Sequence, residues 1–513
     1  MLMHQLLLEA AERRPGKLAF RWVDRDRSLS YAEMVAAMDR MAGALHSLGV
    51  AKGDRVTVFA HNGMDYLVAM FGAWRIGAIA ALVNVRLAED LDYYLNDHRP
   101  RVVIYTHDMA ATVKRAAAAS GVAHLVCMDG PQDGALALSE LLAADLPPPP
   151  DPWDESAIAH LSYTSGTTGK PKAACLAHEP TVRACRCIAE RLRITERDVS
   201  FGPTALSSSY QLVGNLLPPL AQGCSIHVMG RWAQGTGFDA IDAAQATVLV
   251  GNPILLDEVI VESRRRGRPP GRLRFVLTGG GPMPIAAKRA WRDELAIPVV
   301  ESYGQSELGG FVALGFPELA PSEEVLTRIG PPLPDKEVRI VGPDDRPLPA
   351  GEIGDIVLRG GFMSGYWGRA AQTAEATRGG WLRTGDLGIM DRDGAVTLRG
   401  RQSELIIVGD RPWYPRDIEE ELCGQTGVRQ AALIGVADQA VGARPIAFVT
   451  IDAGATVDTD ELKRAIAPRL AYDLAPLQIR VVAELPMTPT GKISKSDLAL
   501  RMTGAGAAAK AAT

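Results

Sequence analysis

Short apolar runs alternate with longer helical patterns along much of this chain, and that alternation constrains its fold more than any other feature. The segment 31–48 has the pattern of one such helix. The runs that are typical of strands are 55–60, 101–105, 123–128, 224–229, 247–250 and 274–278. Strands separated by helices usually form largely parallel sheets with helices on their faces. We therefore expect an α/β fold built from stacked sheets.

Length and a change of pattern predict more than one domain. The chain has 513 residues, which is longer than the stretch of chain that usually folds around a single hydrophobic core. From 328 onward, short strands with many turns predict a small β-barrel that closes the large domain. Beyond 401, strands near 431–436, 446–451 and 479–482 and a helix near 460–470 predict a compact α+β segment.

The segment 163–172 reads Tyr-Thr-Ser-Gly-Thr-Thr-Gly-Lys-Pro-Lys and directly follows an apparent strand. Its glycines let the backbone turn and bring N–H groups close to anionic oxygens, while hydroxyls and ammonium groups add donors. Clusters of this composition are more often plain surface turns. Two residues separate the glycines and proline follows the first lysine, so the P-loop NTPase pattern is excluded. We predict a phosphate-binding loop made by Thr164, Ser165, Gly166, Thr167, Thr168, Gly169, Lys170 and Lys172.

Composition excludes several classes of protein. A net charge of −5 with 22% charged residues gives no polycationic bias, so we expect no nucleic-acid partner. Six scattered cysteines without a Cys-x-x-Cys pair are typical of a reducing cytoplasm rather than a disulfide scaffold or a zinc site. The amino terminus lacks the basic start and long apolar core of a signal peptide. The apolar region 68–85 is broken by Arg75, so we expect no membrane span there but a buried helix followed by a strand. We expect a cytoplasmic protein.

Four further motifs follow the loop in order. They are Tyr303-Gly-Gln-Ser-Glu307, Trp381-Leu-Arg-Thr-Gly-Asp386-Leu387, Gly400-Arg401 and Pro489-Thr-Gly-Lys492-Ile493. Together with the loop they resemble the phosphate loop, the Tyr-Gly-x-Thr-Glu block, the Thr-Gly-Asp block, the hinge and the C-terminal lysine loop of the adenylate-forming superfamily. That superfamily contains acyl- and aryl-CoA synthetases, peptide-synthetase adenylation domains and luciferases.

The resemblance implies an architecture and a reaction. It implies a large N-terminal domain, 1–400, a small mobile C-terminal domain, 401–513, and a site between them. In that family a carboxylate attacks the α-phosphate of ATP, pyrophosphate leaves, and the acyl-adenylate passes to an acceptor while the small domain rotates. ATP and Mg²⁺ are therefore the expected cofactors, and a small carboxylic acid or another small oxyanion is the expected substrate. CoA is the first expected acceptor, with a carrier protein as another possibility.

The resemblance also assigns catalytic roles. In-line attack at phosphorus develops negative charge on oxygens, so the site needs a metal ion, cations and oriented donors. Glu307, by its match to the motif, is the expected magnesium ligand and a catalytic residue. Thr167, also taken as catalytic, or Thr168 would contact phosphate together with Ser306. Lys492 would bridge the substrate oxyanion and the α-phosphate only while the small domain is docked. Without the surrounding motifs, these residues would be interpreted as ordinary surface residues.

The nucleotide-binding assignments follow in the same way. Asp386 would accept hydrogen bonds from both ribose hydroxyls, and Arg401 would reach ribose or phosphate. Tyr303, next to Gly304, would offer a flat face to adenine. The glycines that would let the backbone approach the base and the acyl group are Gly279, Gly280 and Gly281. In this superfamily the acyl pocket lies behind the phosphate loop, and its lining is expected within 206–215, 251–253 and 278–283.

Three departures from the family pattern bear on substrate and acceptor. The segment 203–210 offers serines where the family often has a histidine or an aromatic residue at the acyl pocket, which favours a small polar substrate or one recognised by hydroxyl groups. Ser403 replaces the usual hinge Asp or Lys. The loop 408–415 is one residue shorter than the Ser-Gly-Gly-Glu-Asn loop of CoA ligases and has a single glycine, as in fatty acyl-AMP ligases.

Several functions therefore stay open. We rank an acyl- or aryl-CoA ligase first and a CoA-independent adenylating enzyme second, either an acyl-AMP ligase or an ATP-dependent diazotase that activates nitrite for attack by an arylamine. A nucleotide-binding protein without catalysis would not need Glu307, Asp386 and Lys492. A hydrolase is disfavoured because Leu308 replaces the second glycine of a Gly-x-Ser-x-Gly turn and His-Glu-x-x-His is absent.

Overall fold

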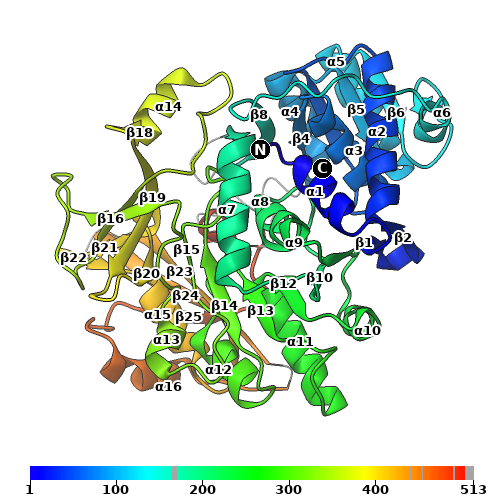
Figure 1. The fold of residues 1–513 in the computed structure, drawn as a ribbon. Coiled ribbons are helices and arrows are strands. Elements are labelled where there is room, and N and C mark those ends of the chain that lie inside the picture. Colours follow the sequence, from blue (N-terminus) through cyan, green and yellow to red (C-terminus); the bar gives the residue numbers. More distant parts are fainter. Residues whose placement is uncertain (165–169, 439–441, 453, 489–491, 503–513) are drawn as a thin grey trace.

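The computed structural model describes residues 1–164, 170–438, 442–452, 454–488 and 492–502. Two large sheets, each largely parallel and covered by helices, come first in the chain, and two smaller sheets follow (Figure 1). The expected α/β fold is confirmed. No helix among these residues is long and apolar enough to cross a membrane.

The first large sheet carries the predicted phosphate loop at one edge. Its strand order is β7 (Leu136–Ala137), β6 (His124–Cys127), β5 (Val102–Tyr105), β3 (Arg55–Phe59), β4 (Ile79–Leu82), β8 (Ile158–Tyr163) and β9 (Ala173–Ala177). All neighbours are parallel except β8 and β9, which are antiparallel and are joined by the loop. The predicted strands at 55–60, 101–105 and 123–128 are confirmed as β3, β5 and β6.

The second large sheet contains the other predicted strands. Its order is β15 (Ala313–Leu314), β14 (Val299–Tyr303), β13 (Phe275–Thr278), β12 (Val248–Gly251), β10 (Val199–Gly202), β11 (Ser225–Val228), β1 (Leu18–Trp22) and β2 (Arg27–Ser30). Only the two edge strands are antiparallel to their neighbours. The carboxyl ends of β12, β13 and β14 therefore lie at one edge, which is where ligands bind in sheets of this kind.

Apolar helices fill the space between the two sheets, and one hydrophobic cluster draws on both of them. Helix α2 (Tyr31–Ser47) begins with a capping box, in which Ser30 N–H donates to Glu33 at 2.7 Å and Glu33 N–H donates to Ser30 Oγ at 3.3 Å. Helix α3 (Met64–Arg75) is buried on nearly every face, as its apolar residues from Tyr66 to Trp74 require. The expected buried helix and strand within 68–85 are thus confirmed as α3 and β4.

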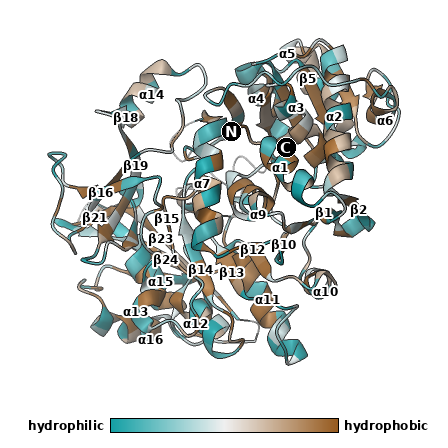
Figure 2. Ribbon diagram, viewed as in Figure 1, coloured by the Kyte–Doolittle hydropathy of each residue, from teal (hydrophilic) through white to brown (hydrophobic). Residues whose placement is uncertain are grey.

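The remaining helices of this part alternate with the strands. They are α1 (Gln5–Arg13), α4 (Leu91–His98), α5 (Ala110–Ser120), α6 (Leu138–Ala143), α7 (His178–Arg191), α8 (Ser209–Gln211), α9 (Leu217–Gln222), α10 (Gln234–Ala244), α11 (Pro253–Arg266), α12 (Ile285–Asp293), α13 (Glu323–Thr327) and α14 (Ala370–Ala376). A π-helical segment, Leu212–Leu216, joins α8 to α9. Figure 2 shows the apolar residues concentrated on the strands and on the inner faces of the helices.

Two smaller sheets form the rest of the chain. The third consists of β16 (Glu337–Val341), β17 (Gly354–Arg359), β18 (Thr377–Arg378), β19 (Trp381–Met390) and β20 (Val396–Arg401), where the sequence predicted a small barrel. The fourth consists of β21 (Ile406–Val408), β22 (Arg411–Trp413), β23 (Val428–Asp438), β24 (Gly442–Ile451) and β25 (Gln478–Val481), with helices α15 (Pro415–Cys423), α16 (Thr459–Ile466) and α17 (Lys495–Met502).

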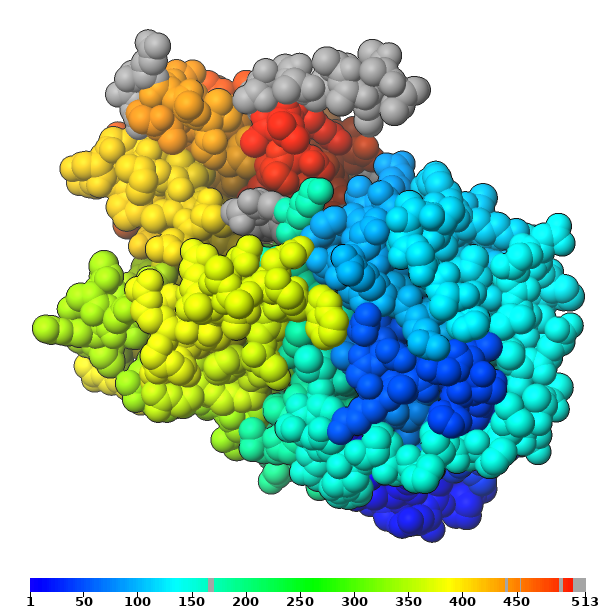
Figure 3. All heavy atoms as spheres, turned by 90° about the horizontal axis from the view of Figure 1, so that it is seen from above, coloured from blue at the N-terminus to red at the C-terminus, as the bar shows by residue number. Residues whose placement is uncertain are grey.

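The C-terminal segment has hydrophobic clusters of its own. Two clusters contain only residues from 406 onward. In Figure 3 this segment, in orange and red, forms the upper left and centre of the view, above the yellow part of the chain. A domain boundary between 400 and 401 remains a proposal, which this separation of the cores supports.

Candidate active site

The predicted phosphate loop is closed at its base. The main-chain N–H of Thr164 donates to the carbonyl oxygen of Lys172 at 2.9 Å, and the N–H of Lys172 donates to Oγ1 of Thr164 at 3.2 Å. The hydroxyl of Ser306 donates to the carbonyl of Tyr163 at 3.4 Å, which attaches the second motif to this base. The predicted residues Ser165, Gly166, Thr167, Thr168 and Gly169 lie outside the described residues, so their roles stay predictions.

The two loop lysines lie over aromatic rings. Nζ of Lys170 is 5.2 Å from the centroid of the Tyr93 ring, and Nζ of Lys172 is 4.4 Å from the centroid of the Tyr366 ring. A cation over an aromatic face is attracted by the negative charge of the π system. Each ammonium group is therefore held over the face of a tyrosine ring.

A buried chain of hydrogen bonds supports the start of the loop. Nδ1 of His98 lies 2.8 Å from the Tyr163 hydroxyl, and Nε2 of His98 lies 2.6 Å from Oγ1 of Thr57. The Tyr163 hydroxyl donates to Oδ2 of Asp97 at 3.0 Å, and Arg369 binds Oδ1 of the same carboxylate at 2.7 Å. Burial lowers the pKa of His98 to about 3, so the imidazole is neutral at physiological pH. Sequence motifs gave no signal for this network beyond Tyr163 itself.

The predicted ribose ligand Asp386 is held by three groups. Oδ2 accepts hydrogen bonds from the Tyr303 hydroxyl at 2.8 Å and from Nε2 of Gln305 at 2.6 Å, and Nε of Arg401 lies 3.3 Å from Oδ1. Burial raises the pKa of the Asp386 carboxyl, and the Arg401 charge is the largest influence in the opposite direction. Three predicted nucleotide-binding residues, Asp386, Tyr303 and Arg401, therefore lie together, and Gln305 joins them although the sequence did not single it out.

The Tyr303 ring is only 4% exposed and belongs to a hydrophobic cluster. Its neighbour Gly304 is also closely packed, because a Cβ there would lie 3.2 Å from the Phe311 ring. The stacking of Tyr303 on adenine stays a prediction.

Glu307, the predicted magnesium ligand, lies beside the loop. Its Oε1 accepts a hydrogen bond from the Tyr366 hydroxyl at 2.8 Å, and the ring of the same Tyr366 carries Lys172 on its face. Mg²⁺ usually binds one or two carboxylates and completes its shell with water and substrate phosphates. A half-buried single carboxylate next to a phosphate loop fits that requirement. Among the described residues there is no cluster of three or more His, Cys, Asp or Glu side chains suited to a metal.

The three predicted glycines follow β13 directly. Gly280 has a φ of 79°, in the left-handed region that favours glycine. Gly279 is needed for a different reason, because a Cβ there would collide with the Ser302 hydroxyl and lie 2.9 Å from Cε2 of Tyr210. Gly281 has open space where a Cβ would point. Their approach to the nucleotide stays a prediction.

Lys492 reaches this site from the C-terminal segment. Its loop is closed by the N–H of Thr488, which donates to the Lys492 carbonyl at 2.7 Å, while 489–491 lie outside the described residues. Burial lowers the pKa of the Lys492 ammonium, and the charge of Arg401 lowers it further. The carboxylates of Asp386 and Glu307 act in the opposite direction. The structure thus brings Lys492 into the electrostatic surroundings of the ribose and magnesium candidates.

Buried polar contacts hold the C-terminal segment in this position. The N–H of Ile285 donates to Oε1 of Glu420 at 2.5 Å, and Arg416 lies 3.6 Å from Oε1 of Glu301. Glu301 is 5% exposed and is also paired with Lys288 at 2.5 Å. Because Arg416 and Glu420 both belong to α15, this helix ties the segment that carries Lys492 to β14 and α12.

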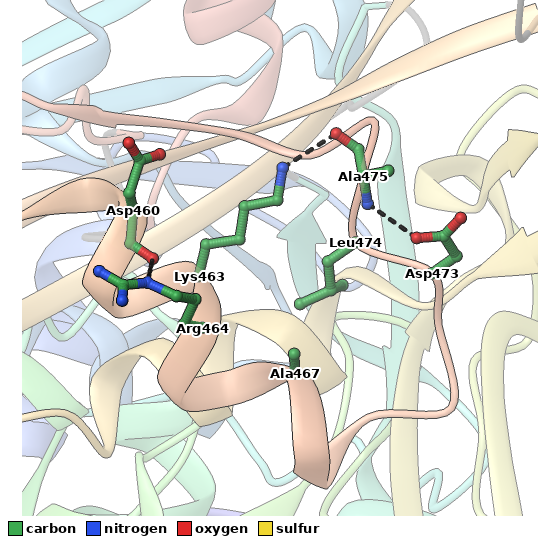
Figure 4. Close-up of a pocket in the computed structure, with 7 residues that line it drawn as sticks. All are labelled: Asp460, Lys463, Arg464, Ala467, Asp473, Leu474 and Ala475. Atoms are coloured by element: carbon green, nitrogen blue, oxygen red, sulfur yellow. Dashed lines mark hydrogen bonds between the residues drawn. The ribbon is translucent and has the colours of Figure 1, made fainter.

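A surface hollow on the C-terminal segment lies apart from this site (Figure 4). Its lining residues are Asp460, Lys463, Arg464, Ala467, Asp473, Leu474 and Ala475. The Lys463 ammonium donates to the carbonyls of Ala475 at 2.9 Å and Leu477 at 2.8 Å. Lys463 therefore joins α16 to the loop that follows it.

Comparison with known proteins gives matches over nearly the whole chain. A family model described as AMP-binding enzyme matches residues 7–367, and one described as AMP-binding enzyme C-terminal domain matches residues 417–492. A feruloyl-CoA synthase from Amycolatopsis sp is 33% identical over 92% of this chain and 94% of that protein. A 4-hydroxybenzoate–CoA/benzoate–CoA ligase from Rhodopseudomonas palustris is 30% identical over 94% of this chain and 91% of that protein.

A solved structure has the same fold throughout. The anthranilate CoA ligase AuaEII in complex with anthranoyl-AMP superimposes with a TM-score of 0.91 over 99% of this chain and 98% of that one. The sequence identity is 24%. The stacked sheets and the C-terminal α+β segment are therefore arranged as in that protein.

Proposed function

The chain belongs to the AMP-binding enzyme family, and from that membership we propose that it uses ATP to adenylate a carboxylic acid and then transfers the acyl group to CoA. It is an AMP-forming ligase, like the relatives named as CoA ligases and synthetases. The resemblance that the motifs predicted is confirmed. The observation that carries the proposal is the position of Lys492, which shares its surroundings with Asp386, Arg401 and Glu307.

The proposed roles follow from charge. Asp386 would accept the ribose hydroxyls, and Glu307 would hold Mg²⁺ against the phosphates, which neutralises charge as pyrophosphate leaves. Lys170 and Lys172 would bind the leaving phosphates. Lys492 would pair with the attacking carboxylate and the α-phosphate oxygens, the only place where negative charges of both reactants meet. In each proposed role, the charge of the side chain is opposite to that of the group it would bind, or its oxygens accept the hydrogen bonds that the group donates.

The names of the relatives support an aromatic acid as substrate. Feruloyl, benzoate and anthranilate are all aromatic acyl groups or acids. We therefore infer that this enzyme activates an aryl or short acyl acid. We place the reaction in the cytoplasm, as the cysteine pattern predicts.

The acceptor is the finer part of the proposal. The loop 408–415, whose sequence departs from the CoA-ligase pattern, belongs to a tight hairpin of β21 and β22. In this hairpin Ile406 pairs with Trp413, and Val408 pairs with Arg411. Only Gly409 and Asp410 form its turn, and Gly409 has a φ of 66°. The relatives named as CoA ligases make CoA the first acceptor to test, and a CoA-independent reaction is the competing outcome.

One experiment separates these outcomes. Purified protein is given Mg-ATP and a panel of aryl and short acyl acids, and pyrophosphate exchange into ATP is measured without an acceptor. Release of AMP is then measured with CoA, without CoA, and with nitrite plus an arylamine. The proposal requires acid-dependent exchange and AMP release that CoA accelerates together with formation of the thioester. AMP release that ignores CoA and requires nitrite and the amine would overturn it.

A further inference from the structure

Tyr210 is fixed between two strand ends. Its hydroxyl lies 2.8 Å from the carbonyl oxygen of Leu277 on β13 and 3.1 Å from that of Gly251 on β12. Burial of this hydroxyl raises the pKa of Tyr210 well above its usual value, so it keeps its proton and donates to these carbonyls. These hydrogen bonds join 206–215 to 251–253 and to the end of β13, and the ring packs at Gly279, so the side chain touches all three segments within which the acyl pocket was expected.

The Tyr210 ring is also held by packing. It lies on the backbone of Gly279, where a Cβ would be 2.9 Å from Cε2, and its centroid is 6.1 Å from that of Phe311. Gly214, in the same segment, is also closely packed, because a Cβ there would lie 3.0 Å from Val250. Two hydrogen bonds and two packing contacts leave the ring little freedom to rotate away.

The serines that precede Tyr210 place it next to the phosphate loop. The hydroxyls of Ser209 and Ser162 are hydrogen-bonded, and Ser162 lies on β8, two residues before Thr164. The hydroxyl of Ser208 accepts the N–H of Tyr210 at 3.2 Å. Both hydroxyls are therefore used inside the protein, which weakens the expectation that they recognise a polar substrate.

The polar side chains that follow Tyr210 are also satisfied internally. Gln211 donates to the carbonyl of Gly202 at 2.8 Å and accepts from Thr204 at 2.5 Å. Asn215 accepts from Ser200 at 2.7 Å. With these amides occupied, the aromatic ring of Tyr210 is the group of this segment that lies against both Gly279 and Phe311.

We propose that Tyr210 is the floor of the acyl pocket and restricts this enzyme to compact acids, a single ring attached to the carboxyl group or a chain of similar length. The inference rests on the proposed function, because the carboxylate of the acid must lie beside the phosphate loop to reach the α-phosphate. The remainder of the acid then extends toward β12 and β13, where the fixed ring ends the available depth. A longer acid must displace a side chain that two carbonyls and two packing contacts hold, and such overpacking is costly.

The test measures pyrophosphate exchange with two pairs of acids, benzoate against biphenyl-4-carboxylate and hexanoate against dodecanoate. For the unchanged enzyme we expect kcat/KM to fall at least about tenfold from the compact to the long member of each pair. Tyr210→Ala removes the ring and should raise the long-to-compact ratio by at least about tenfold. Tyr210→Leu, which keeps an apolar side chain of intermediate size, should give an intermediate ratio and serves if the alanine variant unfolds.

A matched control removes a comparable hydroxyl elsewhere. The buried Tyr31 hydroxyl donates to the carbonyl of Cys224 at 2.6 Å, so Tyr31→Phe loses a similar hydrogen bond and should leave the acid preference unchanged. Two results would overturn the inference and leave the proposed function standing. One is exchange in the unchanged enzyme that is as fast with the long acids as with the compact ones. The other is a long-to-compact ratio of kcat/KM that stays the same in the Tyr210 variants. Absence of exchange with every acid in every variant would contradict the proposed function itself.

Discussion

Lys492 and Asp386, which are 106 positions apart in the chain, lie close enough that each alters the pKa of the other. Burial is the largest cause that lowers the pKa of Lys492, and the Asp386 carboxylate opposes it. Burial likewise raises the pKa of Asp386, and Lys492 is among the groups that oppose it. One site therefore contains the candidate ribose ligand and the lysine of the C-terminal loop.

Replacing Tyr366 tests the magnesium assignment. Tyr366→Phe keeps the ring that covers Lys172 and removes the hydroxyl that donates to Glu307. Groups that orient a metal ligand typically change metal affinity by about 10- to 100-fold when they are lost. We expect the Mg²⁺ concentration for half-maximal exchange to rise about tenfold at saturating ATP. An unchanged Mg²⁺ requirement would show either that Glu307 does not bind the metal ion or that Tyr366 does not orient Glu307.

Replacing Asp386 tests the ribose assignment. Asp386→Asn keeps the shape of the side chain and removes the charge that Arg401 and the ribose hydroxyls would share. Hydrogen bonds to a charged group contribute about 1.5–3 kcal/mol. We therefore expect the Kd for ATP, measured by calorimetry without acid, to rise by about one order of magnitude or more. The control is Asp345→Asn, in the exposed turn between β16 and β17, which should bind ATP normally.

The sequence predicted the parts of the site that local patterns define. The approximate positions of several strands follow from short apolar runs, and short motifs singled out the loop between β8 and β9, Asp386 and Lys492. Tyr366 could not be found this way, because its link to Glu307 joins positions 59 apart and no motif surrounds it. Gln305 was inside a recognised motif, but its hydrogen bond to Asp386 joins positions 81 apart, which the motif alone does not show.

The same limit applied to the acyl pocket. The assignment of 206–215 to the pocket lining stays a prediction. The hydroxyl of Tyr210 meets Gly251 and Leu277 because β12 and β13 are parallel and in register, which no local pattern shows. The role of the serines was inferred from a departure from the family pattern, without knowledge of their hydrogen-bond partners. Their partners, such as Ser162 for Ser209, depend on how the two large sheets pack.

Acid should destabilise the protein through His98. The pKa of His98 is lowered by burial to about 3, from an ordinary value of 6.5. Between these values the unfolded chain binds a proton that the folded chain excludes, so stability rises with pH and is lost as the pH falls below about 6.5. From pH 6.5 to pH 4 this group alone removes about 3 kcal/mol of the free energy of unfolding.

Urea unfolding at several pH values measures this effect. His98→Gln should flatten the dependence of the free energy of unfolding on pH in that range, while His46→Gln, at an exposed position, should leave it unchanged. Equal slopes for the parent and His98→Gln would show that His98 is not held neutral by its burial.

The most direct test of the account is pyrophosphate exchange in Lys492→Ala, compared with Lys463→Ala. Both variants lose one ammonium from the C-terminal segment, and Lys463 belongs to the surface hollow of Figure 4. The account predicts that Lys492→Ala lowers the rate of acid-dependent exchange by about 10²- to 10³-fold or more while the Kd for ATP changes little, and that Lys463→Ala exchanges normally. Normal exchange in Lys492→Ala would contradict the claim that this lysine and the phosphate loop act on the same phosphorus.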